Sequence, residues 1–148
     1  MNTIKDNEIR SEIIKEFRKQ AEGKWEPELI DKTVKEMTSL EIQGYAALLT
    51  VTSFILRQHF KVALVDYKEI FDGDSWGLAS AGIGSSAGIV FTSNLDKLFS
   101  DTTNFWFFGA GDYLTMSFYS EDGSFLGTFQ GAALSMVVGG GYGSGNWS

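Results

Sequence analysis

The sequence contains no cysteine, and it contains only one histidine and one proline. The absence of cysteine excludes a disulfide scaffold, a thiol nucleophile and any cysteine-based zinc or iron–sulfur site. A single histidine then leaves no set of three or four clustered ligands for a transition metal. No metal and no other cofactor is therefore expected.

Basic charge and long apolar runs are also scarce. The 12 basic residues face 19 acidic ones, a net charge of −7 that disfavours nucleic acid and anionic lipid as partners. The longest nearly apolar run, 45–56, is well short of the roughly 20 residues that a membrane-spanning helix needs. Residues 1–20 are charged throughout, so we expect no cleavable secretion leader in this chain and no transmembrane helix.

The composition changes near residue 41. Residues 1–41 hold 8 of the 12 basic and 10 of the 19 acidic residues, and their apolar residues recur at spacings of three and four. Gly23 is a natural helix stop, and Pro27 fits the first turn of a second helix. Each predicted helix has one apolar stripe. The first stripe is Ile9, Ile13, Ile14, Phe17 and Ala21, and the second is Leu29 or Ile30, Val34, Met37 and Leu40. We predict a charged amphipathic helical segment over 1–41, which packs either on the rest of the chain or on a partner.

From residue 42 the apolar pattern has a period of two, which indicates half-buried strands. In FILRQHFKVALV, the even positions Phe54, Leu56, Phe60, Val62 and Leu64 alternate with Arg57, His59 and Lys61. Further short strands are predicted in TNFWFFGA, DYLTMSFYS, SFLGTFQGA and ALSMVVG. Many short antiparallel strands are typical of a sandwich or a barrel over residues 42–148. Within them, 92–103 predicts one short helix capped by Ser93 or Asn94.

Residues 42–148 are rich in glycine. Fifteen of the 17 glycines lie between Gly73 and Gly145, where they let strands bend or backbones approach closely. Asp-Gly pairs at 72–73 and 122–123 predict turns. We therefore assign structural turns and barrel closure to Gly73, Gly77, Gly123, Gly127 and Trp147, with Trp147 at the end of a last strand that closes the barrel.

No motif predicts catalysis. His59 has no nucleophile motif such as G-x-S-x-G to serve, and the paired carboxylates lack the distal Glu of a calcium loop. GIGSSA, at 82–87, leads into a strand rather than a helix, and the terminal GGGYGSG has no following Lys-Ser or Lys-Thr. We expect no catalytic residue, and an enzyme is disfavoured.

Aromatic residues, 14% of the chain, offer binding chemistry instead. Phe105 and Phe107 fill the interior while Trp106 and Phe108 cover the outside, or the reverse. Trp76, Trp106 and Tyr113 are the candidate residues for a surface interaction with a partner, a sugar or a lipid.

Four stretches within 42–148 are distinctive in combination: FDGDSWG, NLDKLFSDTTNF, LGTFQGAALS and the terminal Gly-Gly-x-Gly-Ser-Gly-x-Trp. Together they resemble the virulence-associated protein (Vap) family of actinobacterial intracellular pathogens. The resemblance implies an eight-stranded antiparallel closed β-barrel with one short helix between its halves. It also implies a secreted, non-enzymatic protein, some of whose relatives act on host endolysosomal compartments or membranes, and it transfers no functional residues. The missing leader and the helical 1–41 segment depart from the family pattern and keep a cytoplasmic location open.

The resulting hypothesis is a virulence or effector-type barrel that binds a host or microbial component through its outer surface. Two alternatives remain. One is a sugar-binding or small-ligand barrel with Trp76, Trp106 and Tyr113 at its mouth. The other is a membrane-active protein in which AGIGSSAGIVFTS inserts as a hairpin.

Overall fold

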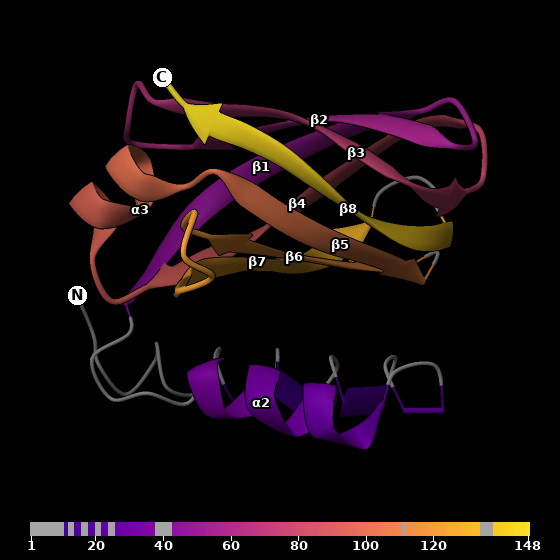
Figure 1. Ribbon diagram of the computed structural model, residues 1–148, viewed down its shortest axis with the longest axis horizontal. Helices are drawn as coiled ribbons and strands as arrows, with labels where there is room; N and C mark the ends of the chain where they lie inside the picture. The colour runs from indigo at the N-terminus through magenta and orange to yellow at the C-terminus, as the bar shows by residue number, and fades with distance from the viewer. Residues whose placement is uncertain are drawn as a thin grey trace.

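The computed structural model shows one closed barrel with a helix lying along its side (Figure 1). It describes residues 11, 14, 15, 18, 19, 22, 23, 26–37, 43–110, 112–133 and 138–148. The helices are α2 (Pro27–Met37) and α3 (Leu95–Asp101). The strands are β1 (Gln43–Ser53), β2 (Arg57–Leu64), β3 (Ile70–Ala79), β4 (Gly82–Thr92), β5 (Asn104–Ala110), β6 (Tyr113–Tyr119), β7 (Phe125–Ala133) and β8 (Val138–Trp147).

The eight strands form the ring β1-β2-β3-β8-β5-β6-β7-β4, with antiparallel pairing between every pair of neighbours. The last strand, β8, lies between β3 and β5, so the chain closes its barrel by inserting its C-terminal strand between two earlier ones. With α3 between β4 and β5, this architecture confirms the predicted fold class.

Packed side chains fill the interior of the barrel. On β5, Phe105 and Phe107 point inward while Trp106 lies outside, which settles the two alternatives left by the sequence. Phe71 lies at the centre of a ring cluster, with centroids 5.4 Å from Phe105, 5.1 Å from Phe118 and 5.6 Å from Trp147. Edge-to-face contacts of this kind stabilise a core beyond the area they bury.

The short helix α3 begins where the sequence predicts it. The side chain of Asn94 accepts a hydrogen bond from the Lys97 amide at 3.1 Å, and Leu98 is fully buried. Phe99 on this helix contacts Trp147 at the end of β8, with 5.3 Å between ring centroids. The helix therefore covers the end of the barrel at which β8 terminates (Figure 1).

Only part of the helical segment predicted over 1–41 lies within the described residues. Helix α2 begins at Pro27 as predicted, and its Ile30 and Val34 are buried against Tyr113 of β6 together with Ile14. Most of the first predicted stripe lies outside the described residues. The described contacts therefore place α2 on the barrel.

One turn prediction was correct and one was wrong. Gly123, at φ +85°, lies in the turn before β7, where the Asp122 carboxylate accepts hydrogen bonds from Ser120 and from the Ser124 amide. These bonds hold the pKa of Asp122 at about 2. The other pair, Asp72 and Gly73, lies inside β3 instead of a turn.

Close packing explains the glycines inside β3 and β7. A Cβ on Gly73 would lie 2.8 Å from the Ser144 carbonyl oxygen, and one on Gly77 would lie 2.2 Å from that of Gly140. A Cβ on Gly127 would lie 2.8 Å from the Phe91 carbonyl oxygen. These glycines thus permit neighbouring backbones to approach rather than the chain to turn.

The strand predicted from residue 54 is shorter than its pattern suggests. Phe60, Val62 and Leu64 are buried as predicted, but β2 begins at Arg57. Phe54 and Leu56 lie exposed in the loop before it. No helix in the described part of the chain is long and apolar enough to cross a membrane.

Candidate functional site

An aromatic row crosses the outer face of three neighbouring strands. Trp76 on β3 lies directly opposite Tyr142 on β8, and Tyr142 lies directly opposite Trp106 on β5. The exposed fractions are 64% for Trp76 and 72% for Tyr142. Since large aromatic residues are usually packed away from water, two exposed neighbours mark this face as a candidate binding surface. We call these three residues the aromatic row.

The β8 strand leaves the surface around Tyr142 open. The next outward positions along the strand are Gly140 and Ser144, which have no side chain and a small one. No bulky neighbour on β8 therefore shields the Tyr142 ring.

Trp106 forms the inner end of the row. It is 9% exposed, and its indole Nε1 donates a hydrogen bond to the Tyr119 hydroxyl at 2.9 Å. Leu29 of α2 lines two surface hollows together with Trp106 and Tyr142, of about 280 and 450 Å³. The row thus runs from open solvent into a groove walled by α2.

A polar row lies next to the aromatic row, two residues along each strand. Asp74, Ser144 and Asn104 face one another across β3, β8 and β5 in the same register as the aromatic residues. Ser144 and Asn104 are exposed, and their side chains make no hydrogen bond to the residues that the structure describes. Their polar groups are available to a ligand.

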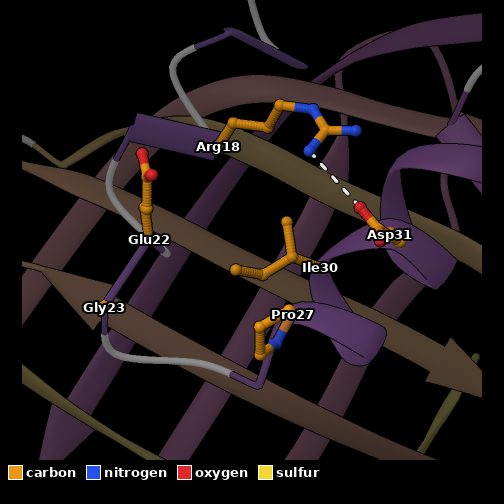
Figure 2. Close-up of a pocket in the computed structure, with 6 residues that line it drawn as sticks. All are labelled: Arg18, Glu22, Gly23, Pro27, Ile30 and Asp31. Carbon is orange, nitrogen blue, oxygen red and sulfur yellow. Dashed lines mark hydrogen bonds and ion pairs between the residues drawn. The ribbon is translucent and has the colours of Figure 1, made fainter.

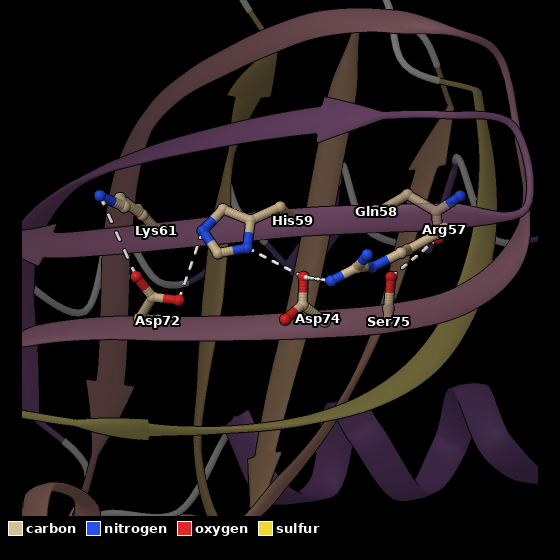
Figure 3. A network of polar contacts seen from close by, with 7 residues as sticks. All are labelled: Arg57, Gln58, His59, Lys61, Asp72, Asp74 and Ser75. Carbon is tan, nitrogen blue, oxygen red and sulfur yellow. Dashed lines mark hydrogen bonds and ion pairs between the residues drawn. The ribbon is translucent and has the colours of Figure 1, made fainter.

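Charged side chains tie β2 to β3 beside this face (Figure 3). The contacts are Arg57 Nη2 to Asp74 Oδ1 at 3.3 Å, His59 Nδ1 to Asp74 Oδ1 at 2.9 Å, His59 Nε2 to Asp72 Oδ1 at 3.3 Å, and Lys61 Nζ to Asp72 Oδ2 at 4.0 Å. The hydrogen bond from His59 is the largest cause that lowers the pKa of Asp74; partial burial opposes it, and the charges of His59 and Arg57 add to it. Asp74 is therefore held as a carboxylate.

The two ring nitrogens of His59 are both engaged by this network. Each ring nitrogen of His59 faces a carboxylate, so neither is directed toward a nucleophile. Among the described residues, no group of three or more His, Asp or Glu side chains is arranged to hold a metal ion. The network's contacts instead join two strands and fix Arg57, whose guanidinium lies 5.4 Å from the Trp76 ring centroid.

Beneath these contacts, the inner side of the same strands carries a buried polar pair. Gln58 is fully buried and accepts a hydrogen bond from Ser75 Oγ at 2.8 Å (Figure 3). Its amide also donates to the Gly77 carbonyl at 3.0 Å. It also donates to the carbonyl of Ile55 at 3.1 Å. Gln58 thereby holds the loop between β1 and β2 in place.

That loop forms an apolar end of the barrel. Phe54, Ile55 and Leu56 are 66%, 51% and 66% exposed, and Ile55 has a φ of +76°. A β-branched residue in this region is strained, by on the order of 1–3 kcal/mol. Exposed apolar side chains continue on neighbouring strand ends at Leu78, Ile83 and Val138. We call these six residues the apolar end.

Polar side chains are also buried on the outer face of β6 and β7. Tyr113 packs against α2, and its hydroxyl donates a hydrogen bond to Gln130 Oε1. The connected residues Thr115, Ser117, Thr128 and Gln130 are all fully buried. Because these polar residues alternate with apolar ones along β6 and β7, the sequence pattern predicts that they face solvent. In the structure this outer side of the two strands is buried instead.

A further hollow of about 410 Å³ lies at the start of α2 (Figure 2). It is lined by Arg18, Glu22, Gly23, Pro27, Ile30 and Asp31. Arg18 and Asp31 form an ion pair at 3.5 Å in this hollow, and both side chains are exposed. Exposed pairs contribute little to stability, so the hollow offers no firmly held charge to a ligand.

The three surface candidates from the sequence occupy different environments. Trp76 is exposed, Trp106 is largely covered beside α2, and Tyr113 is 4% exposed beneath α2. The sequence-based candidates do not include Tyr142, because it lies in a glycine-rich tail whose pattern resembles a phosphate-binding loop. Its place among glycines, as the one large side chain at 139–145, was the available signal.

Comparisons with known proteins agree with this fold. The chain matches the family described as Rhodococcus equi virulence-associated protein over residues 2–148, which includes the N-terminal segment. The structure of VapD from R. equi superposes with a TM-score of 0.70 at 31% identity, covering 72% of this chain and 98% of VapD. VapB from R. equi superposes with a TM-score of 0.68 at 40% identity, covering 72% and 97% of the two chains. Curated protein sequences yield no match.

Proposed function

Since the chain belongs to the Rhodococcus equi virulence-associated protein family, we propose that it is a secreted, non-enzymatic effector-type protein. It acts by binding a host or microbial component through the outer surface of its barrel. The aromatic row, with Trp76 and Tyr142 exposed side by side, is the surface that makes this contact.

The division between a packed inside and an exposed aromatic outside supports this proposal most. Phe60, Phe71 and Phe129 are fully buried in the interior, where an eight-stranded barrel has little room beyond its own side chains. On the outer face, a substantial aromatic area remains in water on the free protein. Exposed aromatic residues of this kind are the usual anchors of binding surfaces.

Binding of the labelled full-length chain to host cells and to bacterial cells tests this function. The double variant Trp76→Ala/Tyr142→Ala is expected to weaken saturable binding by about tenfold or more, because it removes both exposed aromatic anchors. The matched control Leu48→Ala/Val65→Ala removes two other exposed apolar side chains and should leave binding unchanged. Equal curves for the two double variants, or no saturable binding to either cell type, would contradict the proposal.

The apolar end favours a second candidate function, contact with a lipid membrane. Its six side chains are apolar and exposed. One of them, Ile55, is exposed from a backbone conformation with positive φ, which costs the protein stability. The alternative of a hairpin formed by residues 81–93 would require opening the barrel, because β4 is paired with β1 on one side and β7 on the other. Contact through the apolar end requires no such opening.

Flotation of the protein with neutral phosphatidylcholine vesicles tests this second function. Phe54→Ser/Leu56→Ser should abolish co-flotation, whereas Leu48→Ser, on the wall of the barrel, should not. Ile55→Gly should also weaken co-flotation without lowering stability, since glycine adopts positive φ freely. Absence of the wild-type chain from the vesicle fraction would remove this candidate.

A further inference from the structure

The aromatic and polar rows together specify a kind of ligand. The aromatic row provides ring surface across β3, β8 and β5, and the polar row provides a carboxylate, a hydroxyl and an amide beside it. Binding sites that combine ring surface with a few fixed polar groups select ligands having both an apolar face and a polar edge. A sugar ring has this division, with C–H groups on its faces and hydroxyls around its edge.

Each row offers the interaction that one part of a sugar requires. The negative face of an aromatic ring attracts the C–H groups of a stacked sugar, and Tyr142 stands clear of bulky neighbours on its own strand. The carboxylate of Asp74 accepts hydrogen bonds from hydroxyls, while Ser144 and the amide of Asn104 both donate and accept. Because Arg57 and His59 hold Asp74 in place, its carboxylate is already positioned before a ligand arrives.

The length of the surface favours an oligosaccharide over a single sugar. Three adjacent strands separate the outer members of the aromatic row by about 10 Å, twice the spacing between neighbouring strands. The row then continues into the hollow of about 450 Å³ lined by Leu29, Lys32, Asn104 and Trp106. A chain of several sugars can lie along this surface, with one end against α2.

Other ligand classes fit the same face less well. The net charge of −7 opposes nucleic acid, and Arg57, the cation next to Trp76, is paired with Asp74. A lipid chain would leave the side chains of Ser144 and Asn104 buried without hydrogen-bond partners. A peptide cannot extend the sheet here, because β8 is already hydrogen-bonded to β3 and β5 on its two sides.

We infer that the face formed by the aromatic and polar rows binds neutral oligosaccharides. Trp76 and Tyr142 stack on the sugar rings, and Asp74, Ser144 and Asn104 hydrogen-bond to the hydroxyls. This inference rests on the proposed function and names the chemical class of its ligand.

An array of defined neutral glycans, probed with the labelled full-length chain, tests the inference. The array carries β-1,4-linked glucose and N-acetylglucosamine oligomers, α-linked mannose oligomers and N-acetyllactosamine. The wild-type chain should bind at least one series and bind longer oligomers more tightly, with a change in tryptophan fluorescence on titration. Binding to none of them, or equal binding of Tyr142→Ala and wild type, would overturn the inference.

Single variants separate stacking from hydrogen bonding. Tyr142→Ala should weaken binding by about tenfold or more, whereas Tyr142→Phe keeps the ring and should stay within about threefold. Asn104→Ala should weaken binding by roughly three- to tenfold through lost hydrogen bonds. Leu48→Ala serves as the matched control and should bind as wild type does.

Periodate treatment of the target cells distinguishes failure of this inference from failure of the proposed function. Periodate oxidises the neighbouring hydroxyls of sugars, so it should abolish the cell binding that depends on Trp76 and Tyr142. Cell binding that persists after periodate and still requires these two residues would overturn the oligosaccharide while the proposed function stands. Absence of saturable binding to untreated cells would instead contradict the proposed function itself.

Discussion

Gly77→Ala is expected to lower the free energy of unfolding by about 3 kcal/mol, at the upper end for an overpacked site. A Cβ at this position would lie 2.2 Å from the Gly140 carbonyl oxygen and 2.5 Å from the Gly141 Cα. Both are backbone atoms, so no side-chain rotation relieves the contact. The two strands β3 and β8 must separate, and this pair closes the barrel. Urea unfolding followed by circular dichroism measures the change.

Gly140→Ala is the matched control for this prediction. Gly140 lies on the partner strand, and a Cβ there would lie 3.0 Å from its nearest neighbour, the Phe107 carbonyl oxygen. The substitution should cost clearly less than Gly77→Ala, because a shift of a few tenths of an ångström suffices. A Gly77→Ala protein as stable as Gly140→Ala would show that β3 and β8 separate at little cost.

Trp147→Ala should cost about 3–5 kcal/mol, the usual range for removing a large aromatic side chain from a core. Trp147 is 7% exposed, and its ring centroid lies 5.6 Å from that of Phe71, 5.3 Å from that of Phe99 and 5.5 Å from that of Phe118. Its loss would leave a cavity where β8, α3 and the barrel interior meet. The melting temperature should fall by roughly 10 °C, measured by calorimetry.

Trp147→Phe separates ring packing from the polar part of the indole. The buried Nε1 has no hydrogen-bond partner in the described part of the chain, so removing it discards an unsatisfied donor. We therefore expect Trp147→Phe to retain most of the stability that Trp147→Ala loses.

Deletion of residues 143–148 extends this test to the whole end of β8. It removes five residue pairs with β3, from Gly143 opposite Ser75 to Trp147 opposite Phe71, and the hydrogen bonds between Ile70 and Ser148. The melting temperature should fall at least as far as in Trp147→Ala. An unchanged melt would contradict the role of this segment in closing the barrel.

Local sequence patterns predicted the structure correctly where a residue's environment depends only on its own strand or helix. In β2, the period of two correctly placed Phe60, Val62 and Leu64 inside. Pro27 and Asn94 marked the starts of α2 and α3, because a fixed φ and a capping side chain act within one helical turn. The closed barrel itself followed from the family resemblance, since alternation alone left both a sandwich and a barrel open.

Local patterns failed where distant segments decide the environment. The Asp72–Gly73 pair resembles a turn, yet it lies inside β3 because Gly73 is needed where β8 approaches. Tyr113 alternates as an outward residue of its strand, and it is outward, but α2 from the other end of the chain covers it. No property of the strand sequence reports what packs on top of it.

The sequence by itself determined the composition of the chain, the starts of α2 and α3, and the side of β2 that faces the core. These depend on composition and on short-range periodicity, which neighbouring residues express without help from the rest of the fold. Only the tertiary structure decided that Trp76, Tyr142 and Trp106 form one row beside Asp74, Ser144 and Asn104. These residues come from three strands that meet only because β8 inserts between β3 and β5. The register of this pairing depends on how all eight strands pack in the closed barrel, which no single strand sequence specifies.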